Sequence, residues 1–187
     1  MQGSCDSLSP SPLPSSLMAR NVEIKARLSD YEGTVRRAES LSDSPVEIIK
    51  QEDVFFTCPS GRLKLRILGP AQGELIFYQR PDLEGPKTSH YFIAPTSDPA
   101  QMRDVLATAY GEQATVKKVR ALYLVGRARI HLDQVEALGS FLEIEVVLDV
   151  EESFKGGEAE AHSLMRQLGV SVSQLVPGAY VDLLGSR

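Results

Sequence analysis

Charged side chains recur at every second position in several segments of this 187-residue chain. Lys64 and Arg66 alternate with apolar residues in one segment, and Lys118 and Arg120 form a second pair with the same spacing. Because side chains two positions apart on a β-strand point to the same face, each pair presents its cations side by side. Paired cations are suited to binding a polyanion such as a chain of phosphates.

Carboxylates show the same spacing near the end of the chain. Glu143 and Glu145 alternate with apolar residues, so they point the same way and can share one cation. Together with Glu23 from another strand, they predict a site for a hard divalent metal, Mg²⁺ or Mn²⁺. His131 lies in a further charged segment, but a lone histidine is more typical of a barrel or surface position, so we do not include it among the ligands.

The location of these charged faces decides whether they can act together. One polar face on a strand usually faces water, yet these faces consist almost entirely of formal charges, with cations and anions on separate strands. If the sheet closes into a barrel covered by helices, the apolar residues face the helices and the charges face the lumen. Like charges crowded in a lumen cost free energy unless a ligand compensates them. A polyanion would compensate the cations, and a divalent metal would compensate the glutamates.

Periodicity and turn residues define the elements that would carry these side chains. Alternation with period two predicts strands at 21–28, 47–58, 62–68, 74–80, 89–94, 114–125, 127–135 and 141–150. Helical spacing and capping residues predict helices that start near Ser29–Asp30, after Asp98, and at about 158–168. A short strand at 179–184 is expected to dock on the outside. With no regular alternation of strand and helix, we expect a mainly antiparallel, eight-stranded closed β-barrel with about three flanking helices.

Composition restricts the class of protein. The length suits one domain at 19–187, preceded at 1–18 by a Ser/Pro-rich leader that we expect to be disordered. The net charge of −5 and the pI of about 5.3 argue against a general nucleic-acid binder. The apolar runs are too short for a transmembrane helix. Two cysteines give neither a disulfide framework nor a zinc pattern, which is typical of a cytoplasmic protein with reduced thiols.

The order of the charged segments resembles a known family. Asn-Val-Glu-Ile-Lys occupies 21–25, Phe-Leu-Glu-Ile-Glu occupies 141–145, and the basic pair at 61–66, Tyr-Gln-Arg-Pro at 78–81 and the segment 131–139 lie between them. From about residue 19 to residue 184 the chain resembles the CYTH superfamily, the triphosphate tunnel metalloenzymes. Within it, the chain is similar to the CyaB-like, or class IV adenylyl cyclase-like, branch. Asn21 replaces the first glutamate of the family's Glu-x-Glu-x-Lys signature, and the His-Phe pair that cyclases carry before it is absent.

The resemblance implies roles for individual residues. It implies that a divalent metal binds the inward glutamates Glu23, Glu143 and Glu145, with Asp133 supporting the metal or a water in its shell. It also implies that phosphate is held by a set of lysines and arginines: Lys25, Lys64, Arg66, Arg80, Lys118, Arg120 and Arg129.

Three functions stay open for such a tunnel. The first is metal-dependent hydrolysis of inorganic triphosphate, thiamine triphosphate or a nucleoside triphosphate, in which Lys25, flanked by other cations, helps to deprotonate water. The second is an adenylyl cyclase that makes cAMP and pyrophosphate from ATP. The third is a non-catalytic nucleotide or polyphosphate binder, for which Asn21 is the main evidence. A barrel for apolar ligands is disfavoured because its lumen would be apolar. The expected partner is a triphosphate-bearing small molecule rather than a nucleic acid or a membrane, bound by a monomer or a homodimer.

Overall fold

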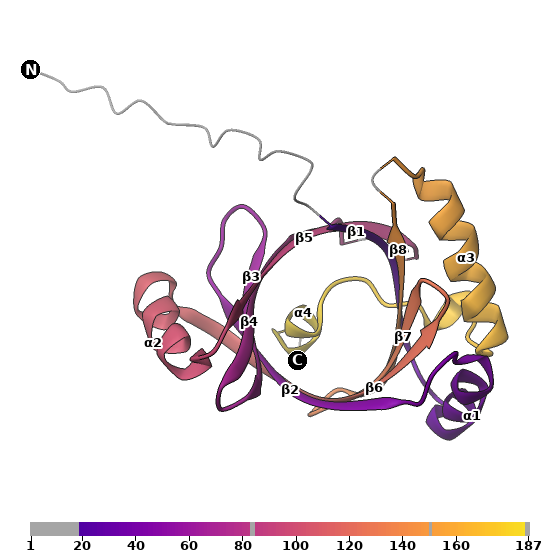
Figure 1. Ribbon diagram of the computed structural model, residues 1–187, viewed down its shortest axis with the longest axis horizontal. Coiled ribbons are helices and arrows are strands. Elements are labelled where there is room, and N and C mark those ends of the chain that lie inside the picture. Colours follow the sequence, from indigo (N-terminus) through magenta and orange to yellow (C-terminus); the bar gives the residue numbers. More distant parts are fainter. Residues whose placement is uncertain (1–18, 83–84, 150, 186–187) are drawn as a thin grey trace, which may run out of the picture.

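Eight antiparallel strands close into a barrel in the computed structural model, which describes residues 19–82, 85–149 and 151–185 (Figure 1). The order around the barrel is β1-β5-β4-β3-β2-β6-β7-β8. The predicted closed antiparallel barrel is therefore confirmed. The strands are β1 (Ala19–Arg27), β2 (Glu47–Phe56), β3 (Arg62–Gly69), β4 (Gln72–Gln79), β5 (Lys87–Thr96), β6 (Glu112–Val125), β7 (Ala128–Val135) and β8 (Gly139–Leu148).

Within the described residues, three α-helices lie outside the barrel, a fourth lies within the ring of strands, and a single 3-10 turn, η2 (Val172–Gln174), comes between α3 and α4 in the sequence. Figure 1 shows α1 (Tyr31–Leu41) and α3 (Phe154–Gln167) on one side and α2 (Pro99–Tyr110) on the opposite side. The short helix α4 (Tyr180–Gly185) lies inside the ring in the same view. The prediction of an outer strand at 179–184 is therefore wrong. The segment is helical, and it packs against the barrel interior.

Local capping explains where α1 and α2 begin. Asp30, rather than Ser29, caps α1, because its side chain accepts a hydrogen bond from the backbone N–H of Gly33 at 2.9 Å. Asp98 caps α2 in the predicted way, with Pro99 in the first turn. Leu106 of α2 is buried against the barrel, whereas its neighbour Val105 is 58% exposed.

The apolar core lies between the barrel and its outer helices. Alternate residues of β1 and β8, such as Ile24 and Ile144, point outward and pack in one cluster with Leu164 and Leu168 from the segment of α3. A second layer packs α2 on β2 and β3 through Leu106, Val54, Phe56 and Leu65. Because the apolar face of the sheet is the outer one, the alternate side chains must point into the lumen.

A third apolar cluster lies at one end of the lumen. Tyr180, the first residue of α4, contacts the ring of Phe141 edge-on with a centroid distance of 5.0 Å. Phe55, Tyr78 and Val116 belong to the same cluster, and the other apolar residues of α4 pack against it. Helix α4 therefore occupies this end of the barrel, which we call the α4 end. We call the opposite end the open end.

Some predictions fall outside the part of the chain that the structure describes. These are the disordered leader at 1–18 and the end of the last predicted strand at Val150. Cys58 carries a free thiol. None of the helices in the described residues is long and apolar enough to span a bilayer.

Candidate functional site

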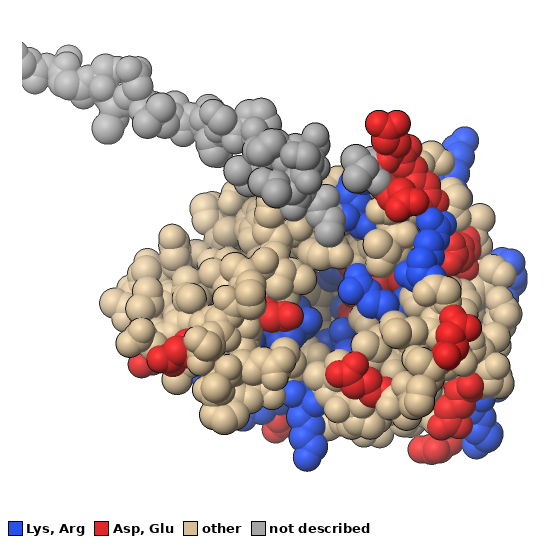
Figure 2. Space-filling model, viewed as in Figure 1, with Lys and Arg blue, Asp and Glu red and all other residues tan. Residues whose placement is uncertain are grey.

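A cavity of about 760 Å³ runs into the barrel and is lined by inward side chains from all eight strands. Figure 2 shows the molecule hollowed at the centre, with lysine and arginine side chains around the hollow. Tyr180 of α4 contributes to the lining near the α4 end. The predicted charged lumen is therefore present in the structure.

The first cation pair is held by an aspartate on the neighbouring strand. The Asp53 carboxylate on β2 lies 2.8 Å from Lys64 Nζ and 2.9 Å from Arg66 Nε on β3. Register explains the contact, because Asp53 and Arg66 are directly paired across the two strands. Burial acts to raise the pKa of Asp53, but Arg66 and Lys64 outweigh it and hold that pKa well below its usual range. Burial and the neighbouring Arg66 lower the pKa of Lys64 to about 8.

The second cation pair has the same construction. Asp133 on β7 lies 2.9 Å from Lys118 Nζ and 2.6 Å from Arg120 on β6. The hydroxyl of Tyr180 also donates a hydrogen bond to Asp133, at 2.9 Å. The carboxylate is fully buried, and although burial acts to raise its pKa, Arg120 and Lys118 keep that pKa low. In both pairs one buried aspartate fixes two cations while their remaining N–H groups can face the cavity.

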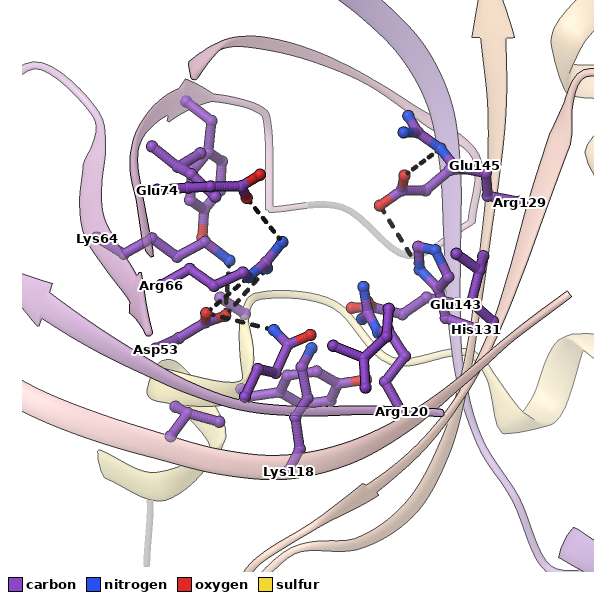
Figure 3. A pocket seen from close by; sticks show the side chains of 18 of the residues that line it. Asp53, Lys64, Arg66, Glu74, Lys118, Arg120, Arg129, His131, Glu143 and Glu145 are labelled. Carbon is purple, nitrogen blue, oxygen red and sulfur yellow. Dashed lines mark hydrogen bonds and ion pairs between the residues drawn. The ribbon is translucent and has the colours of Figure 1, made fainter. Parts of the chain in front are cut away.

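A histidine and two glutamates gather on the β7–β8 wall. His131, Glu143 and Glu145 offer ligand atoms that all lie within 4.8 Å of one another. The His131 Nδ1 atom is buried and finds no hydrogen-bond partner among the described residues. Burial, followed by the charge of Arg120, lowers the pKa of His131 to about 4, so the ring is neutral at pH 7 with a lone pair free to bind a metal. Figure 3 shows this group facing the Asp53–Lys64–Arg66 group across the lumen.

The predicted metal ligands separate into two groups. Glu143 and Glu145 lie together, as expected, and Lys25 Nζ is 2.9 Å from Glu143. Glu23 forms an ion pair with Arg80, and Asp133 is engaged by the second cation pair. Neither of these two belongs to the cluster of ligand atoms, although Glu23 pairs with Glu145 in the strand register.

The remaining predicted phosphate ligands also line the cavity. Arg129 Nε lies 3.2 Å from Glu145, and its Nη2 donates to the Tyr91 hydroxyl at 3.4 Å. Arg80 donates to the carbonyl of Gly178 at 2.8 Å, and Lys25 donates to the same carbonyl at 3.3 Å. These two side chains therefore reach toward the segment that leads into α4.

Arg127 corrects one detail of the predicted charged faces. The predicted strand at 127–135 began with this residue, but Arg127 precedes β7. Its guanidinium pairs instead with Glu152 and Glu160 on the exterior.

Sequence reasoning missed several residues of the cavity. Asp53 follows Gln51 and Glu52 on β2, so no alternation of charged and apolar residues marked it, and Glu74 lies between Gly73 and Leu75 on β4, where the alternation is short. Lys87 at the start of β5 is not one of the lining residues, but it interacts with Arg80, which is. Lys87 is almost fully buried, and burial together with Arg80 lowers its pKa to about 8. Because Lys87 directly follows a Gly-Pro turn, the predicted strand began at residue 89 and did not include it. Tyr180 could not be placed because its contacts depend on the fold of α4.

Asn21 occupies the position of the family's first glutamate and faces the cavity. The residue is only 3% exposed, and its side-chain carbonyl oxygen has no hydrogen-bond partner among the described residues. The amide therefore keeps an acceptor directed at the lumen, although it cannot supply the negative charge of a glutamate.

Comparisons with known proteins agree with this architecture. The model of the CYTH domain family matches residues 19–180. The adenylate cyclase CyaB of Aeromonas hydrophila is 25% identical over 171 residues, which cover 87% of each protein. The solved structure of protein PH1012 from Pyrococcus horikoshii superposes with a TM-score of 0.77 at 25% identity, covering 87% of this chain and 98% of that one. A Hippeastrum protein, described as a candidate adenylyl cyclase with a dominant triphosphatase activity, has a TM-score of 0.60 at 18% identity and covers 89% of this chain and 95% of its own.

Proposed function

The chain belongs to the CYTH domain family, and from this premise we propose that its tunnel binds a triphosphate-bearing small molecule and hydrolyses it with the aid of Mg²⁺ or Mn²⁺. One observation carries the proposal. Two cation pairs, each fixed by a buried aspartate, share one cavity with the His131–Glu143–Glu145 cluster.

The cations account for the binding of phosphate. Two strands that flank β2 carry the four cations: Lys64 and Arg66 lie on β3, and Lys118 and Arg120 lie on β6. Hydrogen bonds to aspartates hold each of them in place in the absence of a ligand. Preorganised cations stabilise charge on a phosphate chain without the cost of rearranging side chains when the ligand binds. Lys25 on β1 and Arg129 on β7 add further donors to the cavity wall.

The chemistry of the donor set fits a divalent metal. Ligand atoms around one ion with bonds of about 2.0–2.2 Å lie roughly 3–4 Å apart, which is compatible with atoms that fall within 4.8 Å of one another. Glu143 and Glu145 would supply anionic oxygens, and His131 would supply a neutral nitrogen. Glu23 and Asp133 would support this site from their ion pairs. A metal held there would neutralise charge on the phosphate oxygens.

The reaction that the site supports is phosphoryl transfer to water. The water oxygen bonds to the terminal phosphorus, the bridging P–O bond breaks, and its electron pair leaves with the diphosphate part. Charge that develops on the transferred group and on the leaving oxygen would be stabilised by the lysines and arginines. Lys25 lies beside Glu143, where it can orient the attacking water, and its predicted role in deprotonating that water stays a proposal.

Product analysis tests the proposal directly. Purified protein would be incubated with inorganic triphosphate, thiamine triphosphate or ATP in the presence of Mg²⁺ or Mn²⁺, and orthophosphate, pyrophosphate and cAMP would be quantified. We expect orthophosphate and the corresponding diphosphate. In the double variant Glu143→Gln/Glu145→Gln, turnover should collapse while metal-free binding of triphosphate survives. Glu39→Gln, on the exposed side of α1, is the control. Turnover by the double variant at the rate of the parent would contradict the assigned site.

Adenylyl cyclase activity is the second candidate, because a relative that matches most of the chain carries that name. The same cations would hold ATP, and the ribose hydroxyl rather than water would attack the α-phosphorus. Formation of cAMP and pyrophosphate in the same assay would favour this function. Binding without any product would favour a non-catalytic role, to which Asn21 would contribute.

A further inference from the structure

Tyr180, the first residue of α4, contacts three charged groups at the α4 end of the lumen. Its ring centroid lies 3.8 Å from Lys25 Nζ and 4.7 Å from Lys118 Nζ. Its hydroxyl donates a hydrogen bond to the Asp133 carboxylate at 2.9 Å. The side chain lines the cavity and is only 5% exposed. Two ammonium groups from different strands therefore share one buried aromatic ring, at distances where a cation is attracted to the ring face.

The chain brings this ring into the lumen by following β1 and then turning inward. Val176 donates its backbone N–H to the carbonyl oxygen of Lys25 at 3.0 Å, so the segment before α4 runs beside β1. Gly178 then takes a φ of +75°, in the left-handed region that favours glycine, and its carbonyl oxygen accepts a hydrogen bond from Lys25 Nζ. Tyr180 comes two residues later. The strand that carries Lys25 therefore also fixes the position of the ring against which this lysine lies.

Strand pairing does not by itself place Lys25 beside Lys118. β8 and β7 lie between β1 and β6 in the barrel, so the two lysines come from strands that are not neighbours. Glu143 on β8 forms ion pairs with both Lys25 and Arg120, but it is also a candidate metal ligand, so a metal bound there would share its charge. The Tyr180 ring attracts both lysines without drawing on a metal ligand. Like charges that lie close together repel, and this attraction offsets part of the repulsion.

We propose that Tyr180 is a positioning residue of the phosphate site, whose ring holds the ammonium groups of Lys25 and Lys118 where the innermost phosphate of a bound chain would contact them. The hydroxyl keeps the ring in this orientation through Asp133. Cations that are fixed before binding lose less side-chain freedom when the ligand arrives. This inference rests on the proposed function and adds to it a residue from outside the barrel strands, so that α4 takes part in binding phosphate.

Metal-free binding of inorganic triphosphate, measured by titration calorimetry with EDTA, tests this role. Tyr180→Leu removes the ring and should raise the Kd about tenfold, because both lysines lose their attraction to it. Tyr180→Phe keeps the ring and loses only the hydroxyl, so its Kd should rise less than about threefold. Tyr110→Leu, which replaces an exposed tyrosine of α2, is the control and should leave the Kd unchanged.

Fluorine atoms on the ring separate positioning from packing. Tyr180→Phe proteins that carry one, three or five ring fluorines, made by incorporating fluorinated phenylalanine, nearly keep the shape of the side chain but withdraw negative charge from the ring face. The Kd of triphosphate should rise with each step, and the thermal midpoint should stay close to that of Tyr180→Phe. Val181→Ala loosens the apolar cluster in which α4 packs without changing an aromatic or charged group, so its Kd should lie within about twofold of that of the parent.

The outcomes distinguish this inference from the proposed function. A constant Kd across the fluorine series, or the parent Kd in Tyr180→Leu, would overturn the positioning role while the phosphate site stands. An equal rise in Kd for Val181→Ala and Tyr180→Leu would overturn it too, because the packing of α4 would then account for the effect. If the parent itself does not bind triphosphate, the proposed function fails and the inference fails with it. The fluorine series decides the question even if Tyr180→Leu does not fold.

Discussion

At the scale of single residues, two aspartates decide how the cations behave. Without Asp53 and Asp133, each lysine–arginine pair would repel within a partly enclosed lumen. With them, each pair is fixed in place, but part of its charge is neutralised before any ligand binds. The aspartates therefore weaken the attraction of the cations for phosphate, and at the same time they hold the cations in fixed positions. This balance can be tested by removing one charge.

Asp53→Asn should tighten metal-free binding of ATP roughly threefold to tenfold, because one negative charge leaves the phosphate site. It should also lower the free energy of unfolding by about 1–3 kcal/mol, because Asn accepts fewer hydrogen bonds from Lys64 and Arg66 than the carboxylate does. Calorimetry and urea denaturation measure the two effects. Glu74→Gln is the matched control, because Glu74 lies 3.9 Å from Arg66 and is more exposed, so both effects should be smaller. Weaker binding of ATP by Asp53→Asn would show that the fixed positions of Lys64 and Arg66 contribute more to affinity than the net charge of the site.

The presence of His131 among the candidate ligands predicts that the site prefers Mn²⁺ to Mg²⁺. A neutral imidazole nitrogen suits Mn²⁺ better than Mg²⁺, which favours an all-oxygen shell. His131→Gln should therefore raise the Kd of Mn²⁺ about tenfold and change that of Mg²⁺ much less, as measured by electron paramagnetic resonance of free Mn²⁺ and by competition. Glu145→Gln should weaken both metals. Unchanged Mn²⁺ affinity in His131→Gln would exclude the histidine from the site.

Lys64 predicts a pH dependence. Its pKa in the free protein is lowered to about 8, so the side chain loses its charge as the pH rises through that value. A bound phosphate favours the charged form, so ATP affinity should fall as the pH rises from 8 to 10, with uptake of a proton on binding. In Lys64→Arg the side chain stays charged up to pH 10, so ATP affinity should fall less between pH 8 and 10 than in the parent. Part of the fall should remain, because Lys87 also has a pKa of about 8. Equal slopes in the two proteins would contradict the assignment.

At the scale of elements, the strands could be predicted and the last helix could not. Alternation placed all eight strands, and it found Lys64, Arg66, Lys118, Arg120, Glu143 and Glu145, because a half-buried strand shows its pattern locally. The segment 179–184 is too short to distinguish helix from strand by pattern. Its helix depends on Asp182, which accepts a hydrogen bond from the N–H of Ala179, and on packing against distant strands. Likewise, no local sequence pattern predicts that Asp53 neutralises Lys64 and Arg66, because the contact depends on the pairing of β2 with β3.

The contact of α3 with the barrel predicts a stability effect. A Cβ atom built on Gly157 would lie 2.6 Å from Leu148 and 2.8 Å from Val22, so α3 approaches β8 and β1 without room for a side chain. Gly157→Val should lower the free energy of unfolding by about 1–3 kcal/mol through overpacking. Gly156→Ala, one residue earlier, would meet only the end of the Glu152 side chain at 3.1 Å and should be tolerated. Chemical denaturation would compare both with the parent.

At the scale of the whole molecule, the site joins strands that are distant in sequence. Cations on β1, β3, β6 and β7 would all contact one phosphate chain, so the ligand would bind the folded barrel and not the unfolded chain. At 100 times Kd such a ligand adds about 2.7 kcal/mol of stability, which for this length raises Tm by roughly 5–10 °C. ATP with Mn²⁺ should produce this shift in a thermal melt, and chelator should reduce it. No shift at saturating ligand would contradict a site inside the barrel.

Helix α4 packs into one end of the lumen, so we expect the tunnel to be closed at that end. A polyphosphate chain could then not pass through the lumen. The protein would remove only the terminal phosphate of such a chain, once in each binding event. The products would also leave in a fixed order. An orthophosphate cut from the tip would lie beneath the remaining part of the substrate, and it could leave only after that part had withdrawn through the open mouth.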